Sequence, residues 1–219
     1  MSRAESIVVV GGGGHARVVM EVLVAAGWRV AGFTDPGGGA FGAIPCLGDD
    51  AALPDLAGRV RYAIVALGDN ALRGRLARRA VELGFELGNA LHPAAQLSPT
   101  ATLGRGIAIM ANAVLNAGAV VLDNAIVNTA ATVDHDCHIG RDVHIAPGAH
   151  LAGYVTVEDG ALVGVGAIVG RGRPVRVGAS AVVGSGSVVV HDVPPFTTVA
   201  GNPARPLRRR AAPPPPEEP

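Results

Sequence analysis

Branched aliphatic residues recur at every sixth position through the second half of the chain. From residue 91 onward, fourteen successive positions spaced by six are branched aliphatic: Leu91, Leu97, Leu103, Ile109, Leu115, Val121, Val127, Val133, Ile139, Ile145, Leu151, Val157, Val163 and Val169. An α-helix has a period of about 3.6 and a plain strand a period of about two, so neither alone explains a period of six. A short strand and a turn on each face of a prism do explain it, because one aliphatic side chain then points inward from every face. The pattern predicts an all-β parallel β-helix of hexapeptide repeats over residues 91–203.

The positions four residues further on are small or modest, as the crowded corners of a prism require: Ala95, Ala101, Ile107, Ala113, Ala119, Ala125, Ala131, Cys137, Val143, Ala149, Val155, Ala161 and Ala167. Three faces make one coil, and residues 91–200 are enough for about six coils stacked at roughly 4.8 Å. The period slips by two across residues 171–174 and resumes at Val177, Val183 and Val189. We expect a loop outside the prism at this slip.

The N-terminal half follows a different pattern. Strands are expected over residues 7–10, 29–33 and 62–67, and helical patterns follow the first and third of them, over residues 16–26 and 71–83. This alternation predicts an α/β domain with a small Rossmann-like parallel sheet in residues 1–90. Its ligand site should lie at the carboxyl ends of the strands. Residues 204–219 are assigned to a C-terminal tail, and its proline-rich end is predicted to be disordered.

A glycine turn follows the first strand. Gly11, Gly13 and Ala16 have the spacing of a dinucleotide fingerprint, and Asp35 comes about 20 residues later. Backbone N–H groups in such a turn can bind phosphate at the start of a helix, and the aspartate can hold a ribose or a base. The alternative is that the glycines only form a tight turn. A domain of about 90 residues has room for half of a dinucleotide fold, which suits one nucleotide better than NAD.

Composition excludes several kinds of chemistry. All 18 basic residues are arginine, which rules out a Schiff-base lysine and a Walker-type phosphate lysine. The net charge is zero, so nothing favours nucleic acid as a partner. Two cysteines make no disulfide framework. With no signal peptide pattern and no apolar run long enough for a membrane span, we expect a cytoplasmic protein that does not bind membranes.

Four histidines fall close together in the repeat region. His135, His138, His144 and His150 lie within sixteen residues, and in principle two or three of them could ligate zinc. We expect no metal, because the spacing differs from that of the zinc-binding β-helix enzymes. His135 lies between two aspartates, and a histidine is well suited to act as a base near neutral pH. Cys137 occupies a small inward position, which favours a packed thiol over an acyl carrier.

Three ordered motifs resemble the NeuD/PglD-type sugar acyltransferases and together span residues 7 to about 207. They are the glycine turn with its histidine at residues 9–16, the segment around the Asp134–His135–Asp136 triplet at residues 128–140, and the Gly-Asn-Pro-Ala-Arg run at residues 201–205. The resemblance implies a left-handed β-helix, a homotrimer with active sites between subunits, and acetyl-coenzyme A as co-substrate. It also implies an acceptor that is a UDP- or GDP-linked amino sugar bound by the N-terminal domain.

The family's functional residues carry over to matching positions. The resemblance implies that His135 is the general base and that Asp136 increases its basicity. It assigns acetyl-coenzyme A binding to His144, Gly153, Val165 and Ser185. It assigns nucleotide-sugar binding to Gly13, Gly14, His15, Asp35, Gly68, Asn70 and Arg73. Relatives often carry a second acidic residue after the aspartate, where this chain has Pro36, so uracil and guanine both stay open as the base.

The resemblance therefore implies an N-acetyltransferase that moves acetyl from acetyl-coenzyme A to the amino group, at C4, of a nucleotide-linked amino sugar. An amine that attacks a thioester must lose a proton, and the developing oxyanion needs hydrogen-bond donors. Acetylation of a sugar hydroxyl or of a small alcohol needs the same base, so the motifs do not separate the two reactions. A third hypothesis is a nucleotide-binding trimer without activity.

Overall fold

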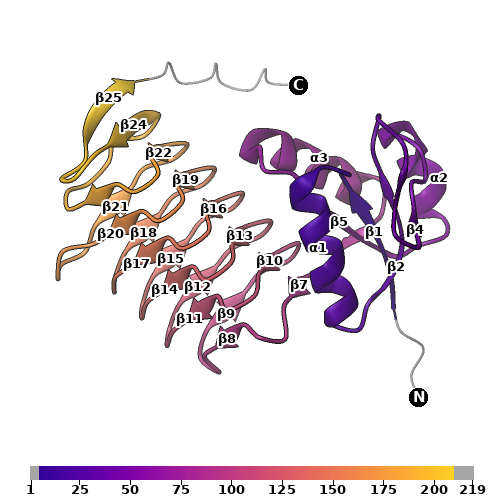
Figure 1. Cartoon of the computed structure of the whole chain (residues 1–219), viewed down its shortest axis with the longest axis horizontal. Helices are drawn as coiled ribbons and strands as arrows, with labels where there is room; N and C mark the ends of the chain where they lie inside the picture. The colour runs from indigo at the N-terminus through magenta and orange to yellow at the C-terminus, as the bar shows by residue number, and fades with distance from the viewer. Residues whose placement is uncertain (1–4, 210–219) are drawn as a thin grey trace.

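The N-terminal part of the chain forms a four-stranded parallel sheet between helices, as the sequence predicts (Figure 1). The computed structural model describes residues 5–209. The strands lie in the order β2 (Arg29–Thr34), β1 (Ser6–Val10), β5 (Tyr62–Val65) and β6 (Glu86–Leu87). Helix α1 (Gly14–Ala25) follows β1 and α3 (Asn70–Glu82) follows β5. All three strand pairings are parallel, so the carboxyl ends of β1, β2 and β5 meet at one edge.

The alternation of side chains along the strands divides the core of this domain in two. Ile7 and Val9 of β1 pack with the apolar face of α1 on one side of the sheet. Val10, with Ala63 and Val65 of β5, packs with α3 on the other side. Between β2 and β5 the chain forms a hairpin of β3 (Ala40–Phe41) and β4 (Ile44–Pro45), a 3-10 turn η1 (Asp50–Ala52) and a short helix α2 (Leu53–Ala57), none of which the hydrophobic pattern indicates.

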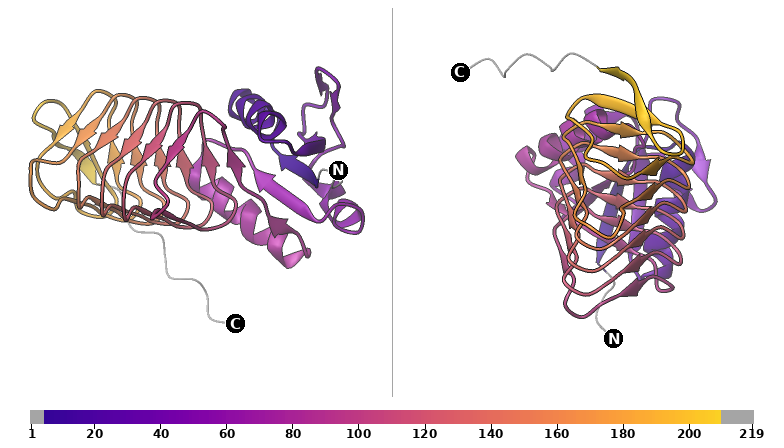
Figure 2. Two further views of the ribbon diagram at one scale, coloured as in Figure 1. Left: turned by 90° about the horizontal axis from the view of Figure 1, so that it is seen from below. Right: turned by 90° about the vertical axis from the view of Figure 1, so that its left-hand side faces the viewer.

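The second part is a prism of three parallel sheets, which confirms the predicted β-helix (Figure 2). The sheets are named here A, B and C in the order in which the chain first enters them. Sheet A contains β7 (Ala90–Leu91), β10 (Ala108–Ile109), β13 (Ile126–Val127), β16 (His144–Ile145), β19 (Leu162–Val163), β22 (Val182–Val183), β24 (Thr197–Ala200) and β25 (Arg205–Arg209). Sheet B contains β8 (Gln96–Leu97), β11 (Val114–Leu115), β14 (Thr132–Val133), β17 (His150–Leu151), β20 (Ile168–Val169) and β23 (Val188–Val189). Sheet C contains β9 (Thr102–Leu103), β12 (Val120–Val121), β15 (His138–Ile139), β18 (Thr156–Val157) and β21 (Arg176–Val177).

The register of sheet A shows the coil length and the predicted slip. Ala90 pairs with Ala108, 18 residues later, and the same step continues to Leu162. Leu162 then pairs with Val182, a step of 20 residues, because the segment after β20 bulges out of the prism. From Ile109 to Val169 the predicted inward aliphatic residues form one buried core. Leu97 is 37% exposed, because β8 is the first strand of sheet B and no coil covers it.

The C-terminal segment departs from the expected tail. Residues 205–209 form β25, which pairs antiparallel with β24 at the end of sheet A. The pairing with β25 satisfies backbone groups of β24 that would have no partners if β24 were the open edge of the sheet. Residues 210–219, including the end predicted to be disordered, lie outside the described residues. Among residues 5–209, no helix combines the length and the apolar character needed to cross a bilayer.

The two domains share a continuous apolar junction. Ala90, Ala108 and Ile126, on the outer face of sheet A, belong to the same buried cluster as Val19 and Met20 of α1. The N-terminal domain therefore covers the first coils of sheet A, while the other two sheets turn away from it (Figure 1). In a three-sided prism, the corner between sheets B and C is the one opposite sheet A.

Candidate active site

His135 lies at the corner between sheets B and C, in the turn from β14 to β15. Its Nδ1 is 2.9 Å from Oδ2 of Asp136, and its backbone N–H donates to Oδ1 of Asp134 over 2.7 Å. The side chain of His135 is 47% exposed. The hydrogen bond to Asp136, and then the charges of both aspartates, raise the pKa of His135 above its ordinary value. Because the carboxylate holds the proton on Nδ1, Nε2 is left with a free lone pair.

The next coil supplies the surface beneath this imidazole. Gly153 stands one coil after His135, and a Cβ built on it would lie 2.5 Å from Nε2 of His135. The absence of a side chain at Gly153 therefore makes room for the ring. Within the described residues, the backbone N–H of Gly153 donates no hydrogen bond. An unused donor next to the lone pair of Nε2 is what an acyl-transfer site needs for a developing oxyanion.

Tyr154 is a neighbour of His135 that sequence reasoning missed. The two rings are perpendicular, with an interplanar angle of 89° and centroids 5.0 Å apart. The backbone N–H of Tyr154 also donates to the carbonyl oxygen of His135 over 3.0 Å. The coil length could have identified this neighbour. Tyr154 is 18 residues after Asp136, so it lies next to Asp136 in the following coil.

The glycine turn lies at the carboxyl ends of the parallel strands, as expected. Gly12 donates its N–H to Oδ2 of Asp35 over 3.0 Å, and a Cβ on Gly12 would meet the side chains of Phe33 and Asp35. A Cβ on Gly13 or Gly14 would meet nothing within 4 Å, so the backbone there faces open space. No side chain caps the start of α1 at Gly13. The first N–H groups of α1 are thus free to meet an anion.

His144 and His15 meet at the junction of the two domains, with ring centroids 6.0 Å apart. Nε2 of His144 is 3.1 Å from Nδ2 of Asn128. Burial, and next the charge of Arg73, lower the pKa of each histidine to about 4. Both rings are therefore neutral near pH 7. Nε2 of His15 is buried without a hydrogen-bond partner among the described residues.

Asn70 and Arg73, which were predicted to bind the nucleotide sugar, make hydrogen bonds within the chain. Arg73 is fully buried. Its guanidinium donates to the backbone carbonyls of Leu67, Asn124, Asp142 and Val143 and to Oδ1 of Asn70. Asn70 donates in turn to the carbonyls of Gly160 and Ala161. These side chains join α3 to the β-helix because the docked domains bury them together, and their donors are used within the chain.

The remaining predicted residues lie at other places in the fold. His144 projects from sheet A, and its Nε2 lies within hydrogen-bond distance of Nδ2 of Asn128. Val165 and Ser185 are exposed at successive corners between sheets A and B. Within one chain, His135 and Gly153 therefore lie at a different corner from Val165 and Ser185, and at the corner opposite the sheet that the N-terminal domain covers.

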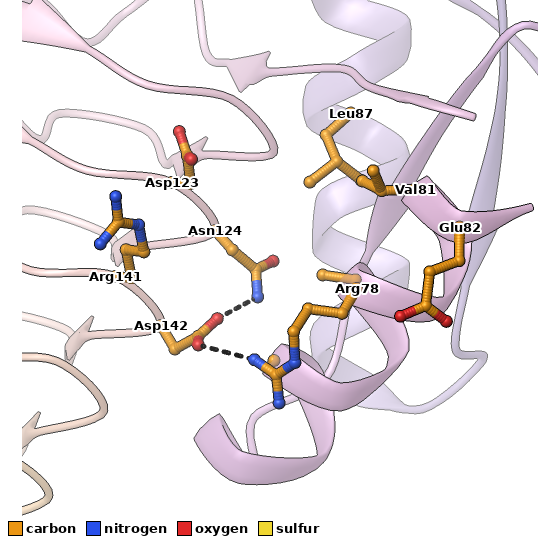
Figure 3. A pocket seen from close by; sticks show the side chains of 10 residues that line it. Arg78, Val81, Glu82, Leu87, Asp123, Asn124, Arg141 and Asp142 are labelled. Carbon is orange, nitrogen blue, oxygen red and sulfur yellow. Dashed lines mark hydrogen bonds and ion pairs between the residues drawn. The ribbon is translucent and has the colours of Figure 1, made fainter. Parts of the chain in front are cut away.

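A hollow of about 390 Å³ lies between α3 and two successive corners of the β-helix, beside the buried Arg73. Figure 3 shows Asp142 between Asn124 and Arg78, with Val81 and Leu87 across the gap. The hollow contains none of the residues predicted to bind substrates. Among residues 5–209, no three His, Cys, Asp or Glu side chains gather where they could hold a metal ion.

An α/β domain with an open glycine turn, followed by a hexapeptide-repeat β-helix with a histidine–carboxylate pair at one corner, defines an acyl-coenzyme A-dependent transferase. Comparison with known proteins gives the family. Residues 6–80 match the model of the PglD N-terminal domain. The chain belongs to the PglD/NeuD-type family of sugar acetyltransferases, because solved members align along nearly its whole length. A comparison with curated protein sequences gives no significant match.

Three solved structures illustrate the relationship. PerB from Caulobacter crescentus, solved with CoA and GDP-perosamine, is 46% identical over 92% of this chain and 96% of its own, with a TM-score of 0.88. The acetyltransferase domain of PglB from Neisseria gonorrhoeae, solved with acetyl coenzyme A, is 41% identical over 94% of this chain and all of its own, with a TM-score of 0.87. WeeI from Acinetobacter baumannii is 26% identical over 93% of this chain and 100% of its own, with a TM-score of 0.84. The matches confirm a Rossmann-like sheet followed by a left-handed β-helix.

Proposed function

We propose that the protein transfers acetyl from acetyl-coenzyme A to the amino group of a nucleotide-linked amino sugar. The observation that carries the proposal is the His135–Asp136 pair beside the free backbone N–H of Gly153. PerB, described as a GDP-perosamine N-acetyl transferase, supports a 4-amino sugar as acceptor and makes GDP the first nucleotide to test. The PglB domain, solved with acetyl coenzyme A, supports the donor.

In the proposed mechanism the amine attacks the thioester directly. Its nitrogen bonds to the carbonyl carbon, the carbonyl electrons move to oxygen, and Nε2 of His135 takes the amine proton. Asp136 keeps the imidazole oriented and stabilises its protonated form. The N–H of Gly153 donates to the oxyanion. The carbon–sulfur bond then breaks, and coenzyme A leaves as a thiolate that accepts the proton.

Cys137 takes no part in this chemistry. It is 1% exposed, and its thiol hydrogen-bonds to the carbonyl of Ala152. Burial raises the pKa of the thiol to about 11. A thiol that stays protonated inside the core is a poor nucleophile. This agrees with the expected packed thiol and favours transfer without an acyl-cysteine.

We further propose that the active site forms between subunits of a homotrimer. The glycine turn, His15, Asp35 and Gly68 surround the nucleotide sugar, while Val165 and Ser185 lie along coenzyme A. His135 stands at the corner opposite the sheet that its own N-terminal domain covers, so an acceptor held by that domain meets the histidine of a neighbouring subunit. The reaction takes place in the cytoplasm, where cells make both acetyl-coenzyme A and nucleotide sugars.

A thioester-release assay tests the reaction. Acetyl-coenzyme A is incubated with UDP- and GDP-linked 4-amino sugars, and with the matching 4-hydroxy sugars as controls. We expect release of free coenzyme A and addition of one acetyl group only with an amino sugar. Equal rates with a hydroxy sugar would make the protein an O-acetyltransferase, and the absence of release with every sugar would leave only a nucleotide-binding role.

Complementation tests the shared site. His135→Ala removes the base and Asp35→Ala weakens nucleotide binding, so each variant alone should have little activity. If the two groups act in one site built from two subunits, mixed trimers contain some intact sites and regain activity. If mixing restores nothing while the mixed trimers form, the base and the nucleotide turn belong to the same chain.

A further inference from the structure

Tyr154 lies against His135 but has no role in the chemistry above. We propose that Tyr154 is a positioning residue that holds the imidazole of His135 with Nε2 over Gly153. The inference rests on the proposed function, because it takes His135 to be the base. It does not require the hydroxyl of Tyr154 to touch a substrate. The ring contact and the backbone conformation carry the argument.

The backbone of Tyr154 is strained for a residue of its size. Its φ is +62°, in the left-handed region that large side chains rarely adopt. The corners of the β-helix repeat this conformation, and its other non-glycine residues are mostly small: Asn112, Asn124, Ala130, Asp136, Asp142, Ser180 and the one other aromatic, Phe196. Phe196 is half-buried, whereas Tyr154 is 54% exposed. Packing in the core therefore does not offset the strain at Tyr154, which points to a functional constraint.

The geometry around His135 shows what the strained residue does. Asp136 holds Nδ1, the bare backbone of Gly153 lies beneath Nε2, and the ring of Tyr154 stands perpendicular to the imidazole at 5.0 Å. Perpendicular aromatic pairs at this separation attract each other. The left-handed φ of Tyr154 is what allows its N–H to bond the carbonyl of His135 while its side chain reaches the imidazole. Without the tyrosine ring, one side of the imidazole is open to water.

This arrangement matters because His135 is half exposed and held by a single side-chain hydrogen bond. An exposed side chain exchanges rotamers quickly. Proton transfer needs Nε2 within hydrogen-bond reach of the attacking amine, so time spent in other rotamers lowers the turnover rate. The charged groups that act on the imidazole are Asp134 and Asp136, on its own corner. The ring of Tyr154 meets the imidazole edge to face, so its effect is on orientation.

The experiment compares Tyr154→Gly, Tyr154→Asn and Tyr154→Phe with the wild type. Glycine and asparagine suit a left-handed φ, so both variants should unfold at the same temperature as the wild type or higher. We expect both to lose about ten- to a hundredfold in kcat, with the KM values for both substrates nearly unchanged. Tyr154→Phe keeps the ring and should keep most of the activity. Asn112→Gly, at another left-handed corner position, is the matched control and should leave kcat unchanged.

A double-mutant cycle shows whether Tyr154 acts through His135. If it does, Tyr154→Gly lowers kcat in the wild type and lowers it no further in His135→Ala. Full kcat in Tyr154→Gly, or an equal loss in both backgrounds, overturns the positioning role. A lower unfolding temperature in Tyr154→Gly and Tyr154→Asn would also overturn it, in favour of a role in the fold. Full activity in His135→Ala would instead refute the proposed base, so the two failures are distinct.

Discussion

Gly153→Ala provides a direct test of the geometry of the base. The new Cβ would lie 2.5 Å from Nε2, 2.6 Å from Cε1 and 3.1 Å from Cδ2, all in the ring of His135. Carbon and nitrogen atoms in contact prefer roughly 3.5–4.0 Å, so the ring must move by about 1 Å or more. Ala117 occupies the equivalent position two coils earlier, which shows that this corner backbone accepts a Cβ. The change therefore acts on the imidazole and leaves the coil intact.

The size of the effect follows from what the ring does. A general base contributes roughly a hundred- to ten-thousandfold, and a misplacement of about 1 Å removes about a hundredfold of it. We expect kcat to fall by about a hundredfold, which corresponds to about 2.7 kcal/mol in the activation free energy. The free energy of unfolding should change by less than about 1 kcal/mol, because alanine replaces glycine without strain in the backbone. The N–H of residue 153 is kept, so the loss reports the histidine and not the oxyanion donor.

The assay measures kcat and KM by coenzyme A release, together with thermal unfolding of each variant. Ala117→Gly is the control, because it changes the same corner position on the other side of the His135 coil and should leave kcat unchanged. Wild-type turnover in Gly153→Ala would refute the reasoning, since it would mean that the imidazole is not needed where the structure places it. A loss of kcat that accompanies a large loss of stability would point to damaged packing.

Two further variants test the electrostatics and the domain junction. Asp136→Asn removes the main cause of the raised pKa of His135, so the acid limb of the kcat/KM profile should move to lower pH. The plateau of the profile should fall by about tenfold, because the ring loses its orienting partner. An unchanged profile would argue against a role for the His135–Asp136 pair. Arg73→Met leaves the carbonyls of Leu67, Asn124 and Asp142 without their donor and should lower the free energy of unfolding by roughly 3–5 kcal/mol. Arg73→Lys should recover only part of this loss in urea titrations. A loss below about 1 kcal/mol would mean that the junction does not need the guanidinium.

The β-helix could be predicted because each coil presents the same environment to the same position. An inward aliphatic residue every six positions is a local signal, and the structure buries these residues from Ile109 to Val169. The strand β25 gave no such signal. Its pairing with β24 depends on the end of the prism, and its residues carry no hexapeptide period. The hairpin of β3 and β4 is too short for any periodicity to indicate.

Contacts between the domains could not be predicted from the pattern for a related reason. Arg73 lies in a helix rich in arginine, and its nearest motif suggested a ligand. Its acceptors at Asn124 and Val143 are 51 and 70 residues away and come together only when the domains dock. His135 was assigned as the base from the resemblance of the motif at residues 128–140, which is a local signal. Tyr154 was missed because its importance depends on the fold of a corner and on the next coil.

The buried junction and the exposed base together support the proposal that a neighbouring subunit completes the site. Arg73 and Asn70 fix α3 to the β-helix, and the neutral pair of His15 and His144 fills the space beside the glycine turn. The orientation of the nucleotide domain is thus set relative to sheet A. Its ligand edge cannot swing to the opposite corner, where His135 stands, without breaking these buried bonds. A rigid junction therefore favours delivery of the acceptor to a neighbouring subunit over a closing motion within the chain.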